Sequence, residues 1–203
     1  MPSRFTVRAD QKLIQIVDAA LGDVTRRSGH WLACRPGCTQ CCIGVFAINQ
    51  LDAARLQRGL QKLEAEAPER AAAVRERARD AVSRLSRNFP GDPATGILGD
   101  SEQCIERFEN FGNDEPCPAL DPESGLCELY EARPMTCRVF GPPVRAESGL
   151  GVCELCFQGA SSEEIAACEM VPDPGNVEET LLAEVEKLSG KRGETIIAFC
   201  LAE

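Results

Sequence analysis

The sequence is poor in the residues on which many metal and cofactor sites depend. It contains a single histidine, His30. One histidine excludes Cys2His2 zinc sites and multi-histidine iron sites, so a metal held by this chain must rely on thiolates, with carboxylates as weaker ligands. A glycine-rich loop of the form G-x-G-x-x-G is also missing, which argues against a nucleotide cofactor.

Basic charge and long apolar runs are scarce as well. The chain has 32 acidic and 22 basic residues, and its formal net charge of −10 argues against nucleic acid or an anionic membrane surface as a partner. No apolar run approaches the roughly 20 residues of a membrane span. The first ten residues lack the apolar segment of a signal peptide. We therefore expect a cytoplasmic protein.

Cysteine, in contrast, is abundant. There are 12 cysteines in 203 residues, although a chain of this length with 43% apolar residues can bury a core without disulfides. In the cytoplasm, cysteines at chelating spacing more often bind a metal or perform redox chemistry than form disulfides. The composition therefore predicts a soft metal centre.

A first array places four cysteines within nine residues. They are Cys34, Cys38, Cys41 and Cys42. Two sulfurs separated by two residues, as in Cys38 and Cys41, can bind one ion without strain. The side chains of the vicinal pair Cys41 and Cys42 diverge, so this pair favours a second metal or a polynuclear cluster over one mononuclear ion.

A second array lies downstream in loops rich in proline and glycine. It consists of Cys117, Cys127 and Cys137, with nine residues between neighbours. Arg133 and Arg138 flank the last cysteine. Guanidinium groups stabilise the negative charge of a thiolate-ligated centre, so both arginines are predicted to lie near the cofactor. We expect the fold to bring the two arrays together.

The remaining cysteines fall into two classes. Cys153 and Cys156 form another C-x-x-C pair, which fits a second site, a ligand pair that completes the first site, or a redox dithiol. Cys104, Cys168 and Cys200 lie on helical stripes or in apolar runs. We predict that these three are core thiols, because a free cysteine packs as a small hydrophobe.

Apolar periodicity predicts a mainly α fold. Spacings of three and four residues predict helices over about 10–27, with Asp10 as the N-cap, and over 101–111. Asn49 with Asp52 predicts the start of a helix that reaches about residue 67, and Pro68 suits the first turn of a helix over 68–85. Two more helices are predicted from about Ser161, with Glu164 three residues on, and from about 176. The segment 195–201 suits either helix or strand. We expect residues 1–203 to form a single compact helical domain. Its long Cys- and Pro-rich loops would be organised around the metal centre, and a helical extension would begin near residue 150.

Two segments resemble the YkgJ-type cysteine-cluster family. These are residues 34–42 and the motif C-P-x-L followed by C-x-x-Y-x-x-R-P-x-x-C-R in residues 117–138. The family has a CxxCxxCC signature, is described as a zinc- or iron-chelating domain, and is related to flagellin lysine-N-methylases. The resemblance covers about 34–140. Cys34 departs from it, because three residues rather than two separate Cys34 from Cys38. The resemblance implies a metal centre of the iron–sulfur or zinc type.

Seven matched cysteines exceed the four ligands of one zinc ion, and all-thiolate ligation favours an iron–sulfur cluster, [4Fe–4S] in the first instance. We therefore expect an iron–sulfur protein for electron transfer or redox chemistry, with an unidentified redox partner. A zinc-stapled interaction module is the alternative, and lysine methyl transfer is a third hypothesis. The predicted ligands are Cys34, Cys38, Cys41, Cys42, Cys117, Cys127 and Cys137.

Overall fold

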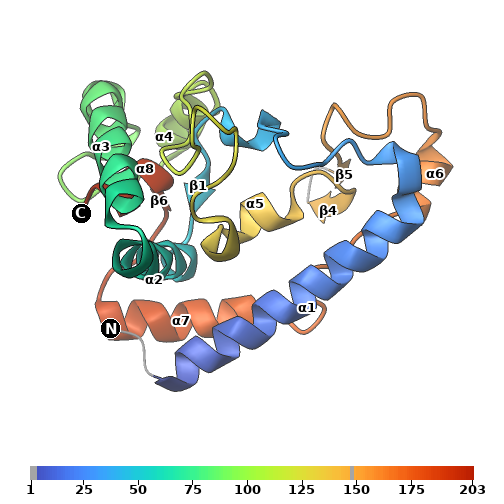
Figure 1. Ribbon diagram of the computed structural model, residues 1–203, viewed down its shortest axis with the longest axis horizontal. Coiled ribbons are helices and arrows are strands. Elements are labelled where there is room, and N and C mark those ends of the chain that lie inside the picture. Colours follow the sequence, from blue (N-terminus) through green and yellow to red (C-terminus); the bar gives the residue numbers. More distant parts are fainter. Residues whose placement is uncertain (1–3, 147–148) are drawn as a thin grey trace. The chain divides into compact units, whose positions relative to one another are not determined.

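The protein is mainly helical (Figure 1). The computed structural model describes residues 4–146 and 149–203. Over these residues it has eight α-helices, and its strands occur only in two-stranded pairs. The predicted mainly α fold with long loops is confirmed. None of the helices in the described ranges is both long and apolar enough to cross a membrane.

The chain divides into two compact units, each made of two stretches of sequence. Unit 1 comprises the residues up to Cys38 together with Met135–Leu188, and unit 2 comprises Thr39–Pro134 together with Ser189–Glu203. Two of the three boundaries fall inside the cysteine arrays, one just after Cys38 and the other between Cys127 and Cys137. The expectation of a single domain over the whole chain stays a prediction.

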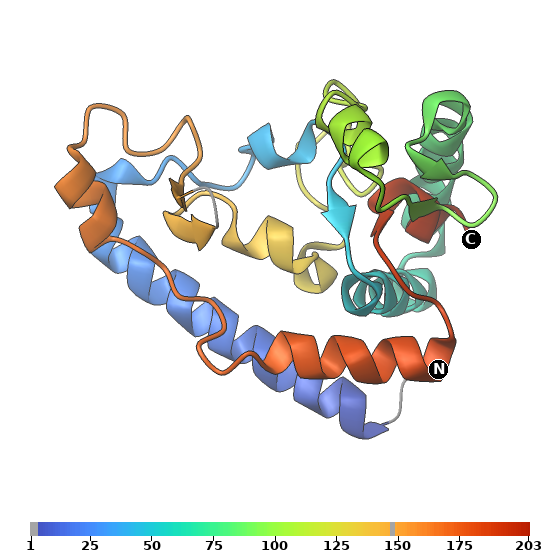
Figure 2. The ribbon, with the colours of Figure 1, turned by 180° about the vertical axis from the view of Figure 1, so that it is seen from behind.

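Unit 1 is organised along its long first helix, α1 (Arg4–Ser28). On its inner face Leu13, Val17 and Val24 are fully buried. The short helix α5 (Met135–Val139) packs against α1. Helix α7 (Val177–Ser189) runs beside the N-terminal half of α1 in both views (Figures 1 and 2), where Thr6 donates a hydrogen bond of 3.3 Å to Glu184.

The predicted start of the first helix was wrong. Asp10 is not an N-cap, because α1 begins at Arg4 and Asp10 is buried inside it. At the other end of α1, Arg27 donates to the carbonyls of Ala167 (2.5 Å) and Glu169 (3.0 Å). These bonds tie α1 to the end of α6 (Ser162–Ala167), which begins at the expected capping box of Ser161 and Glu164.

Three smaller elements complete unit 1. A 3-10 turn, η1 (Gly29–Trp31), follows α1 directly. Strands β4 (Val144–Ala146) and β5 (Gly149–Gly151) form an antiparallel pair.

Unit 2 packs three helices around an aromatic core. Helix α2 (Gln50–Glu66) is capped by Asn49, whose side chain accepts from the Asp52 N–H (2.9 Å), and α3 (Pro68–Leu85) starts with a proline, both as predicted. Helix α8 (Ile197–Ala202) packs against both. The buried core cluster beside α3 and α8 contains Ala81, Leu85, Phe89, Phe111, Ile196 and Ala198.

The segment 195–201 adopts both of the conformations that the sequence left open. Thr195 and Ile196 form β6, which pairs with β1 (Ala47–Ile48), and the chain then turns directly into α8. A β-branched pair suits a strand and the following Ala-Phe-Cys-Leu suits a helix, so each part follows its local propensity.

The other elements of unit 2 are short. A hairpin joins β2 (Gly91–Asp92) to β3 (Ile97–Leu98). The predicted helix over 101–111 is α4 (Glu102–Glu109), and Ser101 is its N-cap. Three 3-10 turns are present in this unit: η2 (Gln40–Cys42), η3 (Ser86–Asn88) and η4 (Tyr130–Ala132).

The close packing of α2 on η4 can be tested with two glycines. A Cβ added at Gly59 in α2 would collide with the Cβ of Ala132, whereas a Cβ at Gly22 in α1 would meet only the tip of Arg26, at 3.9 Å. Gly59→Ala should therefore lower the free energy of unfolding by about 1–3 kcal/mol. Gly22→Ala should raise it by about 0.5–1 kcal/mol. Denaturant unfolding followed by circular dichroism measures both, and a stabilised Gly59→Ala variant would contradict the contact.

Candidate metal centre

The structure distributes the predicted ligands over both units. Cys34, Cys38 and Cys137 belong to unit 1. The other four predicted ligands, Cys41, Cys42, Cys117 and Cys127, belong to unit 2. All twelve cysteines are free thiols.

A loop hairpin in unit 2 holds Cys117 near Cys127. Leu120 and Cys127 form an isolated antiparallel bridge. Next to it, the backbone N–H of Glu128 donates to the carbonyl of Ala119, at 2.8 Å. Main-chain pairing therefore fixes the spacing of these two cysteines, whatever their thiols bind.

The hairpin is closed by a turn built on Asp121. Its carboxylate accepts hydrogen bonds from the backbone N–H of Glu123 (3.4 Å) and from both the N–H (3.1 Å) and the hydroxyl of Ser124. These bonds, led by the Ser124 hydroxyl, hold the pKa of Asp121 below its usual value. The same pattern D-P-x-[S/T]-G recurs at Asp92, which accepts from Ala94 and Thr95 between β2 and β3. The sequence interpretation missed this repeated turn.

The vicinal pair joins the hairpin through the backbone. The N–H of Cys117 donates to the carbonyl of Cys42 at 2.7 Å, and Ile43 forms an isolated antiparallel bridge with Pro116. Within unit 2, part of the first array and part of the second are thus adjacent. We call Cys41, Cys42, Cys117 and Cys127 the unit 2 thiol set.

These four thiols affect one another's protonation. A hydrogen bond from Cys42 lowers the pKa of the Cys41 thiol to about 6, and the same bond raises the pKa of Cys42. Burial raises the pKa of Cys117 to about 12 and also raises the pKa of Cys127. A metal that binds the set must displace the protons that its thiols carry.

Backbone amides are directed at several sulfurs. The N–H groups of Ala119 and Leu120 donate to Cys117, and that of Leu129 donates to Cys127. Each of these bonds lowers the pKa of its thiol, against the larger effect of burial. Amide hydrogen bonds stabilise the thiolate form and fix its direction, which suits a metal ligand.

Arg133 supplies positive charge to the unit 2 thiol set. Its side chain is buried, its guanidinium carbon lies 3.8 Å from the centre of the Tyr130 ring, and its charge lowers the pKa values of Cys41 and Cys127. Arg138 lies in unit 1, where its guanidinium forms an ion pair with Asp18 (2.8 Å). A cofactor role for Arg138 stays a prediction.

Unit 1 contains a second group of four cysteines, which we call the unit 1 thiol set: Cys34, Cys38, Cys153 and Cys156. Partial burial of the sulfur raises the pKa of Cys34 to about 12, although the residue as a whole is exposed, and a hydrogen bond to Cys156 adds to this effect. Cys153 also donates to Cys156, and Cys38 acts electrostatically on both Cys34 and Cys153. The sequence had left the roles of Cys153 and Cys156 open.

Two turns shape the unit 1 thiol set. The N–H of Cys38 donates to the carbonyl of Arg35 (2.9 Å), and that of Cys156 donates to the carbonyl of Cys153 (2.8 Å). The turns are joined just outside the cysteines, where Phe157 donates to the Trp31 carbonyl (2.8 Å) and the two rings stack with centroids 6.4 Å apart.

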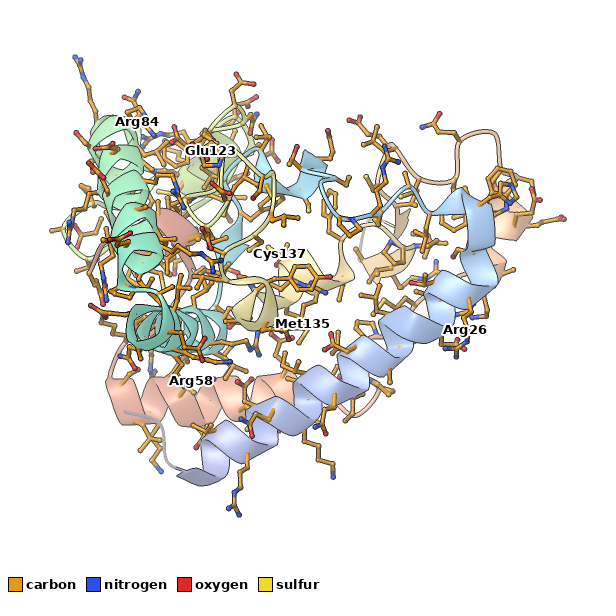
Figure 3. The ribbon with its side chains drawn as sticks, viewed as in Figure 1. Arg26, Arg58, Arg84, Glu123, Met135 and Cys137 are labelled. Carbon is orange, nitrogen blue, oxygen red and sulfur yellow. The ribbon has the colours of Figure 1, made fainter. Side chains whose placement is uncertain are left out.

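The other cysteines have different surroundings. Cys137 lies on α5, two residues after Met135 (Figure 3). Cys168 and Cys200 are buried, and Cys200 donates to the Ala53 carbonyl at 3.3 Å, whereas Cys104 is half-buried. The lone histidine, His30, is exposed.

Neither thiol set is a closed metal cage as it stands. Over the residues that the structure describes, no three His, Cys, Asp or Glu side chains are arranged to hold a metal ion. The donor chemistry nevertheless fits a thiophilic metal. Each set gathers four sulfurs on turns fixed by the main chain, so deprotonation and side-chain rotation are enough to redirect them.

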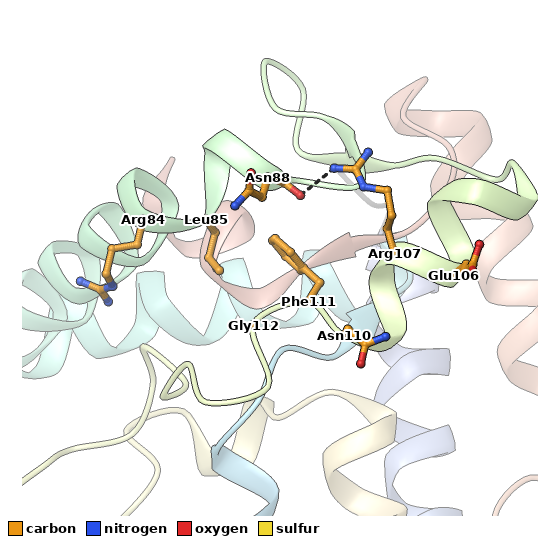
Figure 4. A pocket seen from close by; sticks show the side chains of 8 residues that line it. All are labelled: Arg84, Leu85, Asn88, Glu106, Arg107, Asn110, Phe111 and Gly112. Carbon is orange, nitrogen blue, oxygen red and sulfur yellow. Dashed lines mark hydrogen bonds between the residues drawn. The ribbon is translucent and has the colours of Figure 1, made fainter.

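The cleft in unit 2 between α3 and α4 is a separate feature (Figure 4). It has a volume of about 580 Å³ and is lined by Arg84, Leu85, Asn88, Glu106, Arg107, Asn110, Phe111 and Gly112. Arg107 donates to the Asn88 carbonyl (3.0 Å), and Arg84 pairs with Glu115 (2.5 Å). No cysteine lines this cleft, so it is not the metal site.

Comparison with protein families identifies the chain. The CxxCxxCC family, with the description "Putative zinc- or iron-chelating domain", matches residues 33–156. The chain belongs to this family. The match extends past the predicted limit of about 140 and ends on Cys156, so it includes all of both thiol sets. No curated protein and no solved structure matches the chain. Membership supports metal binding, as predicted.

The twin turns allow a controlled test of the unit 2 hairpin. Asp121→Ala and Asp92→Ala remove equivalent hydrogen bonds, so each should lower the free energy of unfolding by about 1 kcal/mol. Only Asp121→Ala loosens the spacing of Cys117 and Cys127, so it alone should weaken metal binding, by on the order of tenfold. Competition with a chromophoric chelator measures the affinity. Equal affinities in the two variants would show that the hairpin does not position metal ligands.

Proposed function

We propose that this is an iron–sulfur protein that transfers single electrons, with its cluster held by the unit 2 thiol set. The proposal rests on one observation: the vicinal pair lies next to the hairpin. The backbone N–H of Cys117 donates a 2.7 Å hydrogen bond to the carbonyl of Cys42. A [4Fe–4S] cluster accepts thiolates from separate loops. It would also offer Cys41 and Cys42 an iron atom each, which one zinc ion cannot.

The charges around the set support the same choice. A cluster with four thiolates is anionic, and a buried cation stabilises such a centre. Arg133 meets this requirement, since it is 9% exposed and acts on Cys41 and Cys127. When bound, the cluster would supply one-electron redox chemistry.

The apolar shell of the hairpin is a further support. Ala119 and Leu129 are 1% and 3% exposed, and each lies two residues after a cysteine of the set. The N–H groups of both residues lower the pKa of the cysteine two positions before them. Limited solvent access and amide hydrogen bonds are two of the factors that set a cluster's potential.

The proposed setting is the cytoplasm, where twelve free thiols can persist. The partner would be an electron-transfer protein, since a net charge of −10 opposes nucleic acid and anionic membranes. Zinc on the same four thiols is the alternative. Lysine methyl transfer gains no support from the described residues.

The cluster is tested on the full chain purified without oxygen. We expect iron and acid-labile sulfide in equal amounts, with broad visible absorption that dithionite bleaches. Cys127→Ser should lose both signals, because it removes a ligand fixed by the hairpin. Cys200→Ser should keep them, because that thiol is buried against Ala53. A colourless protein that contains only zinc would refute the proposal.

Arg133 provides an independent test of the electron-transfer role. Arg133→Gln removes a positive charge beside the anionic centre, so adding an electron costs more and the reduction potential should become more negative. Arg133→Lys should shift it much less, and Arg79→Gln, at an exposed position of α3, should leave it unchanged. Potentiometric titration followed by visible absorption gives the values. Equal reduction potentials for Arg133→Gln and the native protein would show that Arg133 does not act on the centre.

A further inference from the structure

The unit 1 thiol set has the features of a site in its own right. Its members come from two sequence pairs, one with three intervening residues and one with two, which are the spacings of zinc-binding turns. Hydrogen bonds from Cys34 and from Cys153 converge on the sulfur of Cys156. Gly141 lies between the two pairs: a Cβ there would come within 2.6 Å of the Cys34 sulfur, and its carbonyl accepts from the Cys153 N–H.

The backbone around this set is fixed from several directions. The Trp31–Phe157 hydrogen bond joins the approaches to the two pairs, and the Cys153 N–H donates to the carbonyl of Gly141 (3.3 Å). The N–H of Leu155 donates to the sulfur of Cys153, as the amides of the unit 2 hairpin do to their cysteines. The sulfur-bearing turns are thus held in place before any ligand binds.

Gly141 provides a second, independent observation. A Cβ at this position would lie 2.6 Å from the sulfur of Cys34, and Gly141 has a φ of 122°. Only glycine allows the chain to pass this close to the thiol. The backbone at Gly141 therefore carries no side chain on the side where the sulfur of Cys34 lies. The unit 2 thiol set does not explain this close approach.

The surrounding charges differ from those in unit 2. The groups that raise the pKa values of Cys34 and Cys153 are burial and the other cysteines of the set. No guanidinium group plays the part that Arg133 plays in unit 2 among these causes. Four thiolates brought together here would repel one another unless a divalent cation lay between them.

We propose that Cys34, Cys38, Cys153 and Cys156 form a structural zinc site within unit 1, distinct from the cluster site of unit 2. Four thiolates complete the tetrahedral shell that zinc prefers, with no position left for a substrate. Binding exchanges the thiol protons for Zn²⁺ and releases them to solvent, so it needs no oxidant or reductant. The function of this site is to hold together two remote segments of unit 1.

The first test measures metal content in the full chain. The double variant Cys153→Ser/Cys156→Ser should contain one zinc fewer per chain and keep the visible absorption of the unit 2 cluster. Cys117→Ser/Cys127→Ser should lose that absorption and keep the zinc. Cys104→Ser/Cys168→Ser, at cysteines outside both sets, should keep both. If the Cys153→Ser/Cys156→Ser variant contains as much zinc as the native chain, the zinc site is refuted. This holds even if the unit 2 cluster is present.

The second test uses the glycine contact. Gly141→Ala and Gly149→Ala impose the same backbone strain, since φ is 122° and 125°, but a Cβ at Gly149 would have nothing within 4 Å. Zinc affinity, measured by competition with a chelator, should fall at least tenfold in Gly141→Ala and stay unchanged in Gly149→Ala. Equal affinities would overturn the proposal.

The third test needs no substitution and so remains valid if a variant fails to fold. The native chain is treated with iodoacetamide, with and without added Zn²⁺, and modified cysteines are mapped by mass spectrometry. Cys34 is exposed but its pKa is raised to about 12, so it should react slowly without zinc. Labelling of Cys34, Cys38, Cys153 and Cys156 should fall further when zinc is bound. Equal labelling in both states, or a Cys153–Cys156 disulfide that forms without zinc release, would refute the site and favour a redox dithiol.

Discussion

One main-chain hydrogen bond, from the Cys117 N–H to the Cys42 carbonyl, joins the two cysteine arrays within unit 2. The bridge between Ile43 and Pro116 extends this contact, and the hairpin closed by Asp121 carries it on to Cys127. The sulfurs are therefore placed by peptide groups that stay paired whether or not a metal is present. Such preorganisation lowers the conformational cost of assembling the ligands.

The two thiol sets differ in what surrounds them, and this difference underlies the two assignments. The unit 2 thiol set contains a vicinal pair and lies beside the buried cation Arg133. The unit 1 thiol set contains two separated pairs, in which the pKa values of Cys34 and Cys153 are raised first by burial and then by the neighbouring cysteines. A vicinal pair beside a buried cation suits an anionic polynuclear centre, whereas two separated pairs suit the tetrahedral shell of a single dication.

Local signals predicted the helices well and the distribution of the cysteines poorly. Asn49 and Pro68 mark helix starts by chemistry that acts within a few residues, and both predictions held. Asp10 failed as a cap, because burial of the face of α1 extends that helix upstream of it. Which sulfurs meet depends on contacts between remote segments, which neither spacing nor periodicity encodes. The repeated D-P-x-[S/T]-G turn could have been recognised from the sequence, because both copies are continuous segments.

The place of β6 and α8 in unit 2 has a consequence for biosynthesis. These elements, residues 195–202, pair with β1 and pack on α2 and α3. During translation the unit therefore stays incomplete until residues 195–202 have been synthesised. Through that interval Cys41, Cys42, Cys117 and Cys127 emerge as nascent thiols without a finished fold around them. Loading of the metal should accordingly follow synthesis rather than accompany it.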